Sequence, residues 1–163
     1  MTIAIWYIEM ECELNGLKIK YDDGKLWKWR ELKSKPSYWW ELKGTIDKEY
    51  YRCVIINYKQ YKYHRVVYFI HNQEWNIHNS STDNHIDHID RNQLNNSIEN
   101  LRVVTNQKNQ WNKKDAKGYY LDKWGKYHAH ICVNCKKKYL GYFENEDDAR
   151  NAYLEAKAEY HLF

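Results

Sequence analysis

The sequence predicts an α+β protein of 163 residues that is built mainly from short strands. Three observations predict this fold class. Short apolar–polar alternations fill residues 1–62, and a segment rich in Asn within residues 63–114 carries regularly spaced apolar residues. Residues 115–163 show three strand-like segments ahead of an amphipathic helix. These three ranges are also the predicted modules.

The β-rich N-terminal region, residues 1–62, contains several candidate strands separated by turn signals. The sequence Asp22-Asp23-Gly24 is a typical turn, and the apolar and basic residues alternate on either side of it. Further along, two extended segments flank four polar residues, which predicts a hairpin. The predicted strands are residues 17–21, 26–29, 50–56 and 61–63, and the hairpin loop is residues 57–60.

The central module begins with a predicted short helix from His64 and continues into a polar segment, residues 84–112. The helix has one apolar face, formed by Val66, Val67, Phe69 and Ile70. The polar segment is rich in Asn, Asp and His, yet apolar residues recur through it, which favours a compact hairpin followed by a helix over a disordered loop. These apolar residues are Ile86, Ile89, Leu94, Ile98, Leu101 and Val103.

The C-terminal module starts after a charged segment, residues 112–118, that is the best candidate for a module boundary. Strands are predicted at residues 119–121, 127–133 and 139–143. Asn145 is a predicted N-cap for the final helix, because three acidic residues follow it in the first turn. The face that packs on the sheet is predicted to contain Ala149, Ala152, Tyr153, Ala156 and Tyr160.

Composition limits the function classes. The net charge of +4 permits nucleic-acid binding without establishing it, and the 16 Tyr and 8 Trp suit thin β-rich cores as well as base stacking. Residues 1–11 lack the features of a signal peptide, and no apolar run is long enough to cross a membrane. The four cysteines are too scattered for a disulfide framework, which favours the cytoplasm.

The candidate chemistry lies in the sequence Asn-His-Ile-Asp-His-Ile-Asp, residues 84–90. Phosphodiester hydrolysis needs an activated water, a cation on the scissile phosphate and stabilisation of the leaving oxygen. A neutral histidine takes a proton from water near neutral pH, and a divalent ion on a carboxylate and an amide serves the other two needs. Asp87 and His88 supply an adjacent carboxylate and imidazole, which converge on one centre if they lie at a strand end or bulge.

Residues 64–112, with HRVVYFI and DHIDRNQLNNSIENLRVVTNQKNQWN, resemble the HNH (ββα-metal) endonuclease family, in particular its phage and intron-homing branch. This resemblance implies that His88 is the general base and Asp87 a metal ligand. It also implies that Asn100 orients His88 through an amide hydrogen bond and that Asn109 is the second metal ligand. Arg102 is assigned to the phosphate backbone, Asp90 to a structural role in the turn, and His64 to packing or capping.

Residues 126–131 read KYHAHI, residues 140–143 read LGYF, and Asn134 and the helix residues Ala149, Ala152, Tyr153 and Ala156 complete a pattern. With these residues, the segment 118–160 resembles the Apetala-type DNA-binding domain, which implies a three-stranded antiparallel sheet backed by one helix, with one sheet face in the major groove. Alternation puts residues 127, 129, 131 and 133 on the helix side and the even-numbered residues on the DNA side. His128 and His130 stand where the family usually has arginine. The predicted DNA-binding residues of this module are Lys126, His128, His130, Lys136, Lys137 and Lys138.

The sequence therefore predicts a metal-dependent endonuclease that cuts double-stranded DNA, with Mg²⁺ or Mn²⁺ as the cofactor, in the cytoplasm of a bacterium or a phage-infected cell. Cys132 and Cys135 have the spacing of a zinc half-site, but a structural zinc site needs four ligands, so hairpin cysteines without metal are the default. A homing enzyme acting as a monomer and a restriction enzyme acting as a homodimer both remain open. The alternative from another class is a non-catalytic DNA-binding regulator.

Overall fold

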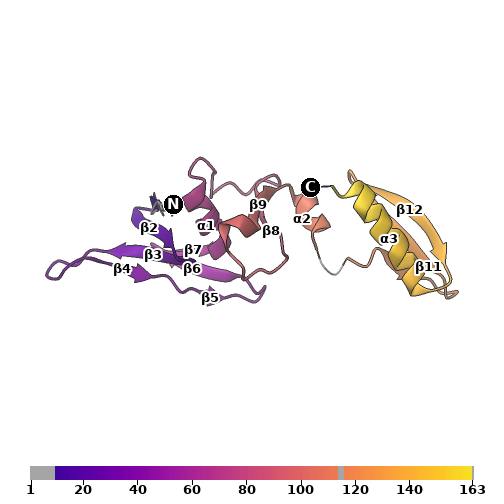
Figure 1. Ribbon diagram of the computed structural model, residues 1–163, viewed down its shortest axis with the longest axis horizontal. Coiled ribbons are helices and arrows are strands. Elements are labelled where there is room, and N and C mark those ends of the chain that lie inside the picture. Colours follow the sequence, from indigo (N-terminus) through magenta and orange to yellow (C-terminus); the bar gives the residue numbers. More distant parts are fainter. Residues whose placement is uncertain (1–9, 114–115, 163) are drawn as a thin grey trace, which may run out of the picture. The chain divides into compact units, whose positions relative to one another are not determined.

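The computed structural model describes residues 10–113 and 116–162 and confirms the mixed α+β class (Figure 1). The chain divides into two compact units between Asn106 and Gln107. The expectation for residues 1–11 falls mostly on residues outside the described part, and so does the predicted module boundary after residue 114. None of the helices in the described ranges is long and apolar enough to cross a membrane.

The first unit begins with an antiparallel sheet in the order β1-β2-β3-β4. Its hairpin turns are tight because Asn15-Gly16 and Asp23-Gly24 have positive φ, as two-residue hairpin loops require. The predicted strands at residues 17–21 and 26–29 are confirmed. The four strands are β1 (Met10–Leu14), β2 (Leu17–Asp22), β3 (Lys25–Arg30) and β4 (Tyr38–Glu41).

A second small sheet follows, with β5 (Thr45–Ile46), β6 (Arg52–Ile56) and β7 (Lys59–Lys62). The β6–β7 hairpin confirms the hairpin prediction, and its two-residue loop is Asn57-Tyr58, both with positive φ. The loop is shorter than the predicted residues 57–60, because Lys59 and Gln60 already pair with β6.

Helix α1 (Tyr63–His71) directly follows β7 and packs its apolar face on both sheets. Val66, Val67 and Ile70 are fully buried, as the sequence predicts, and they share one core with Ile19 of β2 and Ile56 of β6. Residues 10–62 and the helix of the central module are therefore parts of one core, although the sequence pattern treats them as separate modules.

The predicted hairpin and helix of the central module are present. Strand β8 (His85–His88) pairs antiparallel with β9 (Leu101–Val104), and a loop with a short 3₁₀ helix, η1 (Ile98–Asn100), joins them. Helix α2 (Asn106–Trp111) follows β9. Ile86 and Leu101 anchor the hairpin in the core of the first unit.

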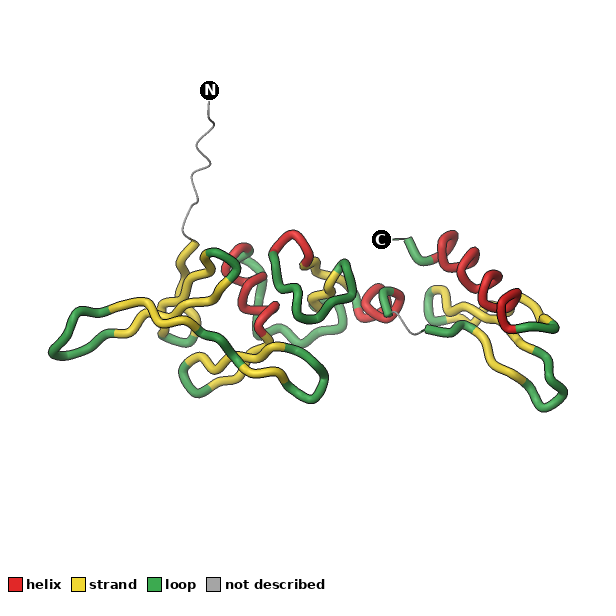
Figure 2. The backbone as a smooth tube through the Cα atoms, turned by 60° about the horizontal axis from the view of Figure 1, so that its bottom comes forward, coloured by secondary structure: helices red, strands yellow, loops and turns green. Residues whose placement is uncertain are grey.

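The second unit contains an antiparallel sheet of β10 (Tyr119–Leu121), β11 (Tyr127–Val133) and β12 (Lys136–Phe143), followed by helix α3 (Glu146–Tyr160) (Figure 2). The predicted cap is confirmed, since Asn145 accepts a hydrogen bond from the Asp148 N–H at 2.9 Å. Ala149, Tyr153 and Ala156 are buried, as predicted for the packing face, and Tyr153 and Ala156 pack on Ile131 of the sheet.

Candidate active site and DNA-binding surface

Asp87 and His88 are both buried, and they end strand β8. Asp87 lies opposite Arg102 in the β8–β9 register, and His88 lies opposite Leu101. Because successive residues of a strand point to opposite sides, the two side chains have different neighbours. Strand β8 ends at His88, and a strand end is one of the two positions at which the sequence analysis expects Asp87 and His88 to converge on one centre.

The Asp87 carboxylate contacts the Arg102 guanidinium across the hairpin. Arg102 donates from Nε and Nη2 to Oδ2 of Asp87, at 3.0 and 2.8 Å. This pair fixes the direction of a buried carboxylate and places positive charge beside it. Arg102, which the sequence analysis assigns to the phosphate backbone, therefore has Asp87 as a partner within the fold.

The hydrogen bond at His88 identifies its tautomer. Nε2 of His88 lies 3.1 Å from Oδ1 of Asn96, and Nδ2 of Asn96 donates to the Leu94 carbonyl. An amide oxygen only accepts, so Nε2 of His88 carries the proton of the neutral ring. Its acceptor nitrogen is then Nδ1, the atom that a general base uses to take a proton from water.

Asn96, a buried residue of the β8–β9 loop, thus occupies the place that the sequence analysis gave to Asn100. Asn100 instead fastens the same loop. Its Oδ1 accepts from the Asp90 N–H, and its Nδ2 donates to the Asp90 carboxylate and to the Asn95 carbonyl. The hydrogen bond from the Asn95 side chain, with those from Asn92 and Asn100, lowers the pKa of Asp90. Asp90 has the structural role that the sequence analysis gave it.

His64 and Tyr51 pack against His88, a neighbourhood that sequence reasoning missed. The ring centroids of His64 and His88 are 4.9 Å apart in an edge-on arrangement, and Tyr51 lies 5.3 Å from His64 and 6.2 Å from His88. Burial, followed by the nearby His88, holds the pKa of His64 well below its usual value, so His64 stays neutral. His64 packs rather than caps, because the N-cap of α1 is Lys62.

Asp47 and Lys62 tie the loop before β6 to the start of α1. Lys62 donates to Oδ2 of Asp47 at 2.6 Å, and Oδ1 of Asp47 accepts from the N–H groups of Glu49 and Tyr51. Lys62 also lies over the Tyr51 ring, 4.2 Å from its centroid. This network sets the position of Tyr51, which is the aromatic neighbour of both histidines.

Of the two predicted metal ligands, Asp87 is a carboxylate and Asn109 an amide. The described residues contain no group of three or more His, Cys, Asp or Glu side chains placed to hold a metal ion. Magnesium needs no such group, because one or two carboxylates hold it together with water and substrate phosphate. Asp87 supplies a buried carboxylate beside a positive charge. Asn109 lies half-buried on α2, within the second unit, and its role as a ligand stays a prediction.

One face of the C-terminal sheet, called the tyrosine face here, contains Tyr120, Tyr139 and Tyr142 together with His128 and His130. His128 pairs with Tyr142 and with Tyr120, and His130 pairs with Tyr139, so these residues share one face. Ala129 and Ile131 are buried on the opposite face, as the alternation predicts. The three tyrosines are 50% to 65% exposed, and none of them is among the predicted DNA-binding residues.

His128 is already engaged within this face. Its Nε2 lies 2.8 Å from Asp122, its Nδ1 lies 3.3 Å from the Tyr139 hydroxyl, and its ring stacks on Tyr120. For His130, burial and then Lys137 lower the pKa, which keeps the ring neutral. His128 is therefore a support for the tyrosine face, while the exposed rings of Tyr139 and Tyr142 are its outermost part.

The lysines of this module lie on different sides. In the β11–β12 register Lys137 pairs with Cys132 on the tyrosine face and lies over the Tyr120 ring. Lys136 and Lys138 pair with Val133 and Ile131 on the helix side, where the Lys138 ammonium bonds the Tyr160 hydroxyl. Lys126 pairs with Glu144. Cys132 and Cys135 are free and exposed.

Residues 61–111 match the model of a family described as HNH endonuclease. The match covers α1, the β8–β9 hairpin and α2, and so includes Asp87, His88 and Asn100. A comparison with curated proteins and one with solved structures found no match. The family match supports an HNH nuclease domain in this part of the chain. HNH nucleases act on DNA and generally use divalent metal ions.

Proposed function

We propose that this chain is a site-specific, metal-dependent DNA endonuclease of the homing or restriction type, with His88 as its general base. The observation that carries the proposal is the hydrogen bond between Nε2 of His88 and Oδ1 of Asn96. It leaves Nδ1 as the acceptor nitrogen on a buried, oriented ring at the end of β8.

In the proposed mechanism Nδ1 of His88 takes a proton from a water molecule, whose oxygen attacks the scissile phosphorus. The bond from phosphorus to the 3′ oxygen breaks, and the leaving 3′ oxygen takes a proton from solvent water. Asn96 holds the ring in the required tautomer, and His64, which stays neutral, packs against its edge. Asp87 and Asn109 would hold the divalent ion, Mg²⁺ or Mn²⁺. The ion would supply positive charge at the scissile phosphate and at the leaving 3′ oxygen. Arg102 keeps the Asp87 carboxylate pointed in one direction.

The C-terminal unit is proposed to bind double-stranded DNA through its tyrosine face, in the manner of the Apetala-type domain that it resembles. Exposed tyrosines bind phosphate through the hydroxyl and contact bases through the ring, and Lys137 adds positive charge on the same face. A DNA-binding sheet that contains none of the proposed catalytic or metal-binding residues favours a long asymmetric target read by a monomer, which is the homing type. A dimer on a palindrome would indicate the restriction type.

The test is incubation of the purified chain with supercoiled plasmid and phage genomic DNA in magnesium, manganese or excess chelator. Nicked or discretely cut products that need the divalent ion support the nuclease, and mapping of their ends separates a rare long site from a short palindrome. DNA that is bound but stays intact under every condition contradicts the nuclease and supports the DNA-binding regulator.

A further inference from the structure

The β3–β4 hairpin extends beyond the sheet from which it arises. Strand β2 pairs with β3 only as far as Lys28, whereas the β3–β4 pairing continues to Arg30 opposite Tyr38. Residues 28–40, called the ribbon here, therefore end as two strands and a loop without a third strand (Figures 1 and 2). The ribbon lies in the first unit and contains none of the residues proposed for catalysis.

The ribbon concentrates positive charge. It contains Lys28, Arg30, Lys33 and Lys35 and a single acidic residue, Glu31. The whole chain has a net charge of only +4, so this short segment accounts for a large part of the excess. A partner of the ribbon is therefore expected to be negatively charged.

One face of the ribbon has a structural explanation. Trp29 and Trp39 are opposite each other in the register, with ring centroids 5.3 Å apart in an edge-on arrangement. Lys20 of β2 lies over the Trp39 ring, 5.1 Å from its centroid. Cross-strand aromatic pairs of this kind stabilise a two-stranded segment, and they account for these two tryptophans.

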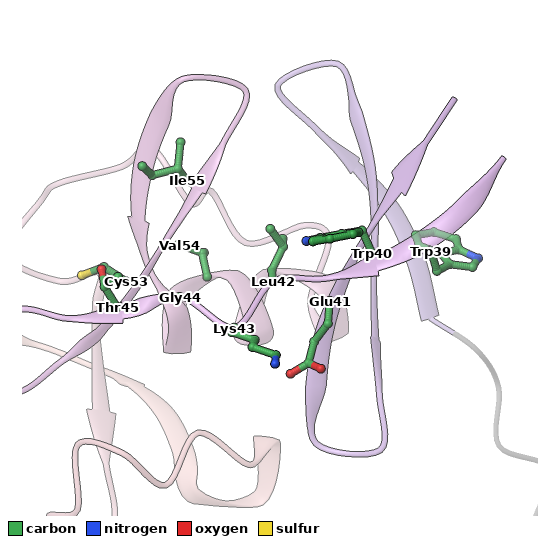
Figure 3. A pocket seen from close by; sticks show the side chains of 10 residues that line it. All are labelled: Trp39, Trp40, Glu41, Leu42, Lys43, Gly44, Thr45, Cys53, Val54 and Ile55. Carbon is green, nitrogen blue, oxygen red and sulfur yellow. The ribbon is translucent and has the colours of Figure 1, made fainter. Parts of the chain in front are cut away.

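The other face is exposed and has no such explanation. Tyr38 and Trp40 lie two residues apart on β4 and are 38% and 48% exposed. Arg30 lies over the Trp40 ring, 4.6 Å from its centroid. Trp40 also borders an open pocket, and Figure 3 shows its ring on the same side of the chain as Leu42, while Glu41 and Lys43 point the other way. An exposed arginine–aromatic pair on a cationic ribbon is a feature of a binding surface.

We propose that the ribbon is a DNA-binding arm that enters the major groove of the duplex beside the cleaved site. The groove admits a two-stranded β-ribbon, and the ribbon's cations match the phosphates on both of its edges. Arg30, Lys33 and Lys35 bind phosphates or base edges, and Tyr38 and Trp40 contact bases. This arm rests on the proposed nuclease function, because that function supplies the duplex, but its binding can be measured without cleavage.

The experiment measures the affinity for a short labelled duplex of mixed sequence, in chelator, over a range of salt concentrations. The variant combines Arg30→Ala, Lys33→Ala and Lys35→Ala, and the control combines Lys48→Ala, Lys59→Ala and Lys117→Ala, which removes the same charge from exposed positions elsewhere. We expect the ribbon variant to bind the duplex at least about tenfold more weakly than the control variant does. The slope of log K against log salt concentration should be smaller in magnitude by about 2 to 3. Equal affinities of the two variants overturn the proposal.

A second variant tests the aromatic part. Trp40→Ala is expected to weaken duplex binding severalfold, whereas Tyr58→Ala, which removes a fully exposed ring from the β6–β7 turn, leaves it unchanged. Polyglutamate serves as the competitor of matched charge. If it displaces the protein from the duplex as well as unlabelled DNA does, the partner is an acidic chain and the assignment to DNA is wrong.

Cleavage is assayed separately on plasmid DNA with magnesium, so that the two proposals can fail independently. If the unchanged chain cuts plasmid but the ribbon and control variants bind DNA equally well, only the proposal of a DNA-binding arm is contradicted. If the ribbon variant loses duplex binding but the unchanged chain cuts no plasmid with any metal ion, only the nuclease proposal is contradicted. Absence of duplex binding by the unchanged chain at low salt contradicts the arm.

Discussion

Arg102 donates two hydrogen bonds to one carboxylate oxygen of Asp87, from opposite positions on β8 and β9. The pair joins the residue proposed to hold the metal ion to the only strand that pairs with β8 in the described sheets. A divalent ion on Asp87 would share this carboxylate with a guanidinium. Arg102 therefore affects both the stability of the hairpin and its response to metal.

Removal of the guanidinium is expected to destabilise the chain and to increase its response to metal. Arg102→Ala leaves a buried carboxylate with less compensation, at a cost of about 1 to 3 kcal/mol in the free energy of unfolding. Magnesium then replaces the lost positive charge, so Tm should rise more on addition of magnesium in this variant than in the unchanged chain. The magnesium-induced rise in Tm of Arg102→Lys should lie between those of Arg102→Ala and the unchanged chain. Equal magnesium-induced changes in Tm would contradict the prediction that Arg102 and the metal ion compete for Asp87.

Loss of the Asn96 amide should reduce turnover more than DNA binding. Asn96→Ala removes the acceptor that fixes the proton on Nε2 of His88, and misorientation of such a group costs about 10- to 100-fold in activity. The measurements are single-turnover cleavage and duplex affinity. Asn151→Ala, an exposed position on α3, is the control. Undiminished turnover in Asn96→Ala would mean that Asn96 does not position His88.

The Asp47–Lys62 pair should make stability fall in acid. Lys62 holds the pKa of Asp47 well below its usual range, which is near 3.9 in an unfolded chain. A carboxyl group whose pKa is lower in the folded chain stabilises the fold fully at pH values above its unfolded pKa. This stabilisation is lost progressively as the pH falls from the unfolded pKa toward the folded one. Asp47→Asn should therefore have a lower Tm at pH 6, and the difference should narrow toward pH 3. A difference that stays constant across this range would exclude the ion pair as its cause.

Removal of one exposed ring from the tyrosine face should weaken DNA binding. Tyr142→Ala removes a 65% exposed ring from the sheet face and should weaken duplex binding severalfold without changing Tm. Leu154→Ala, an exposed position on α3 and thus on the other side of this unit, is the matched control. Comparable affinities of the two variants would place the DNA-binding surface elsewhere.

Local patterns in the sequence predict much of this fold. The apolar face of α1, the Asn145 cap and the alternation in β11 all depend on residues that are close in the chain, and the structure confirms them. The pairing of Asp87 and His88 on one strand end also follows from their adjacency.

The rest depends on contacts that no local pattern encodes. Several asparagines lie between His88 and β9, and only the path of the loop decides that Asn96 rather than Asn100 reaches the imidazole. Tyr51 and His64 reach His88 from other elements of the fold.

Tyr139 and Tyr142 are three residues apart and would face opposite sides of a regular strand. An irregularity in the β11–β12 register, beside Gly141 with φ 132°, puts both on one face. Gly141, a glycine inside a strand, is the feature of the sequence that could have indicated this irregularity, but no bulge was predicted there.

The role of His88 is tested by comparing plasmid cleavage in magnesium by the unchanged chain and by His88→Ala. Duplex affinity is measured in parallel, and His78→Ala, which changes an exposed histidine, is the control. A general base contributes about 100- to 10,000-fold to rate, so His88→Ala should lose at least about 100-fold in cleavage while its duplex affinity stays within about twofold. Cleavage by His88→Ala at the rate of the His78→Ala control would contradict the assignment of His88 as the general base.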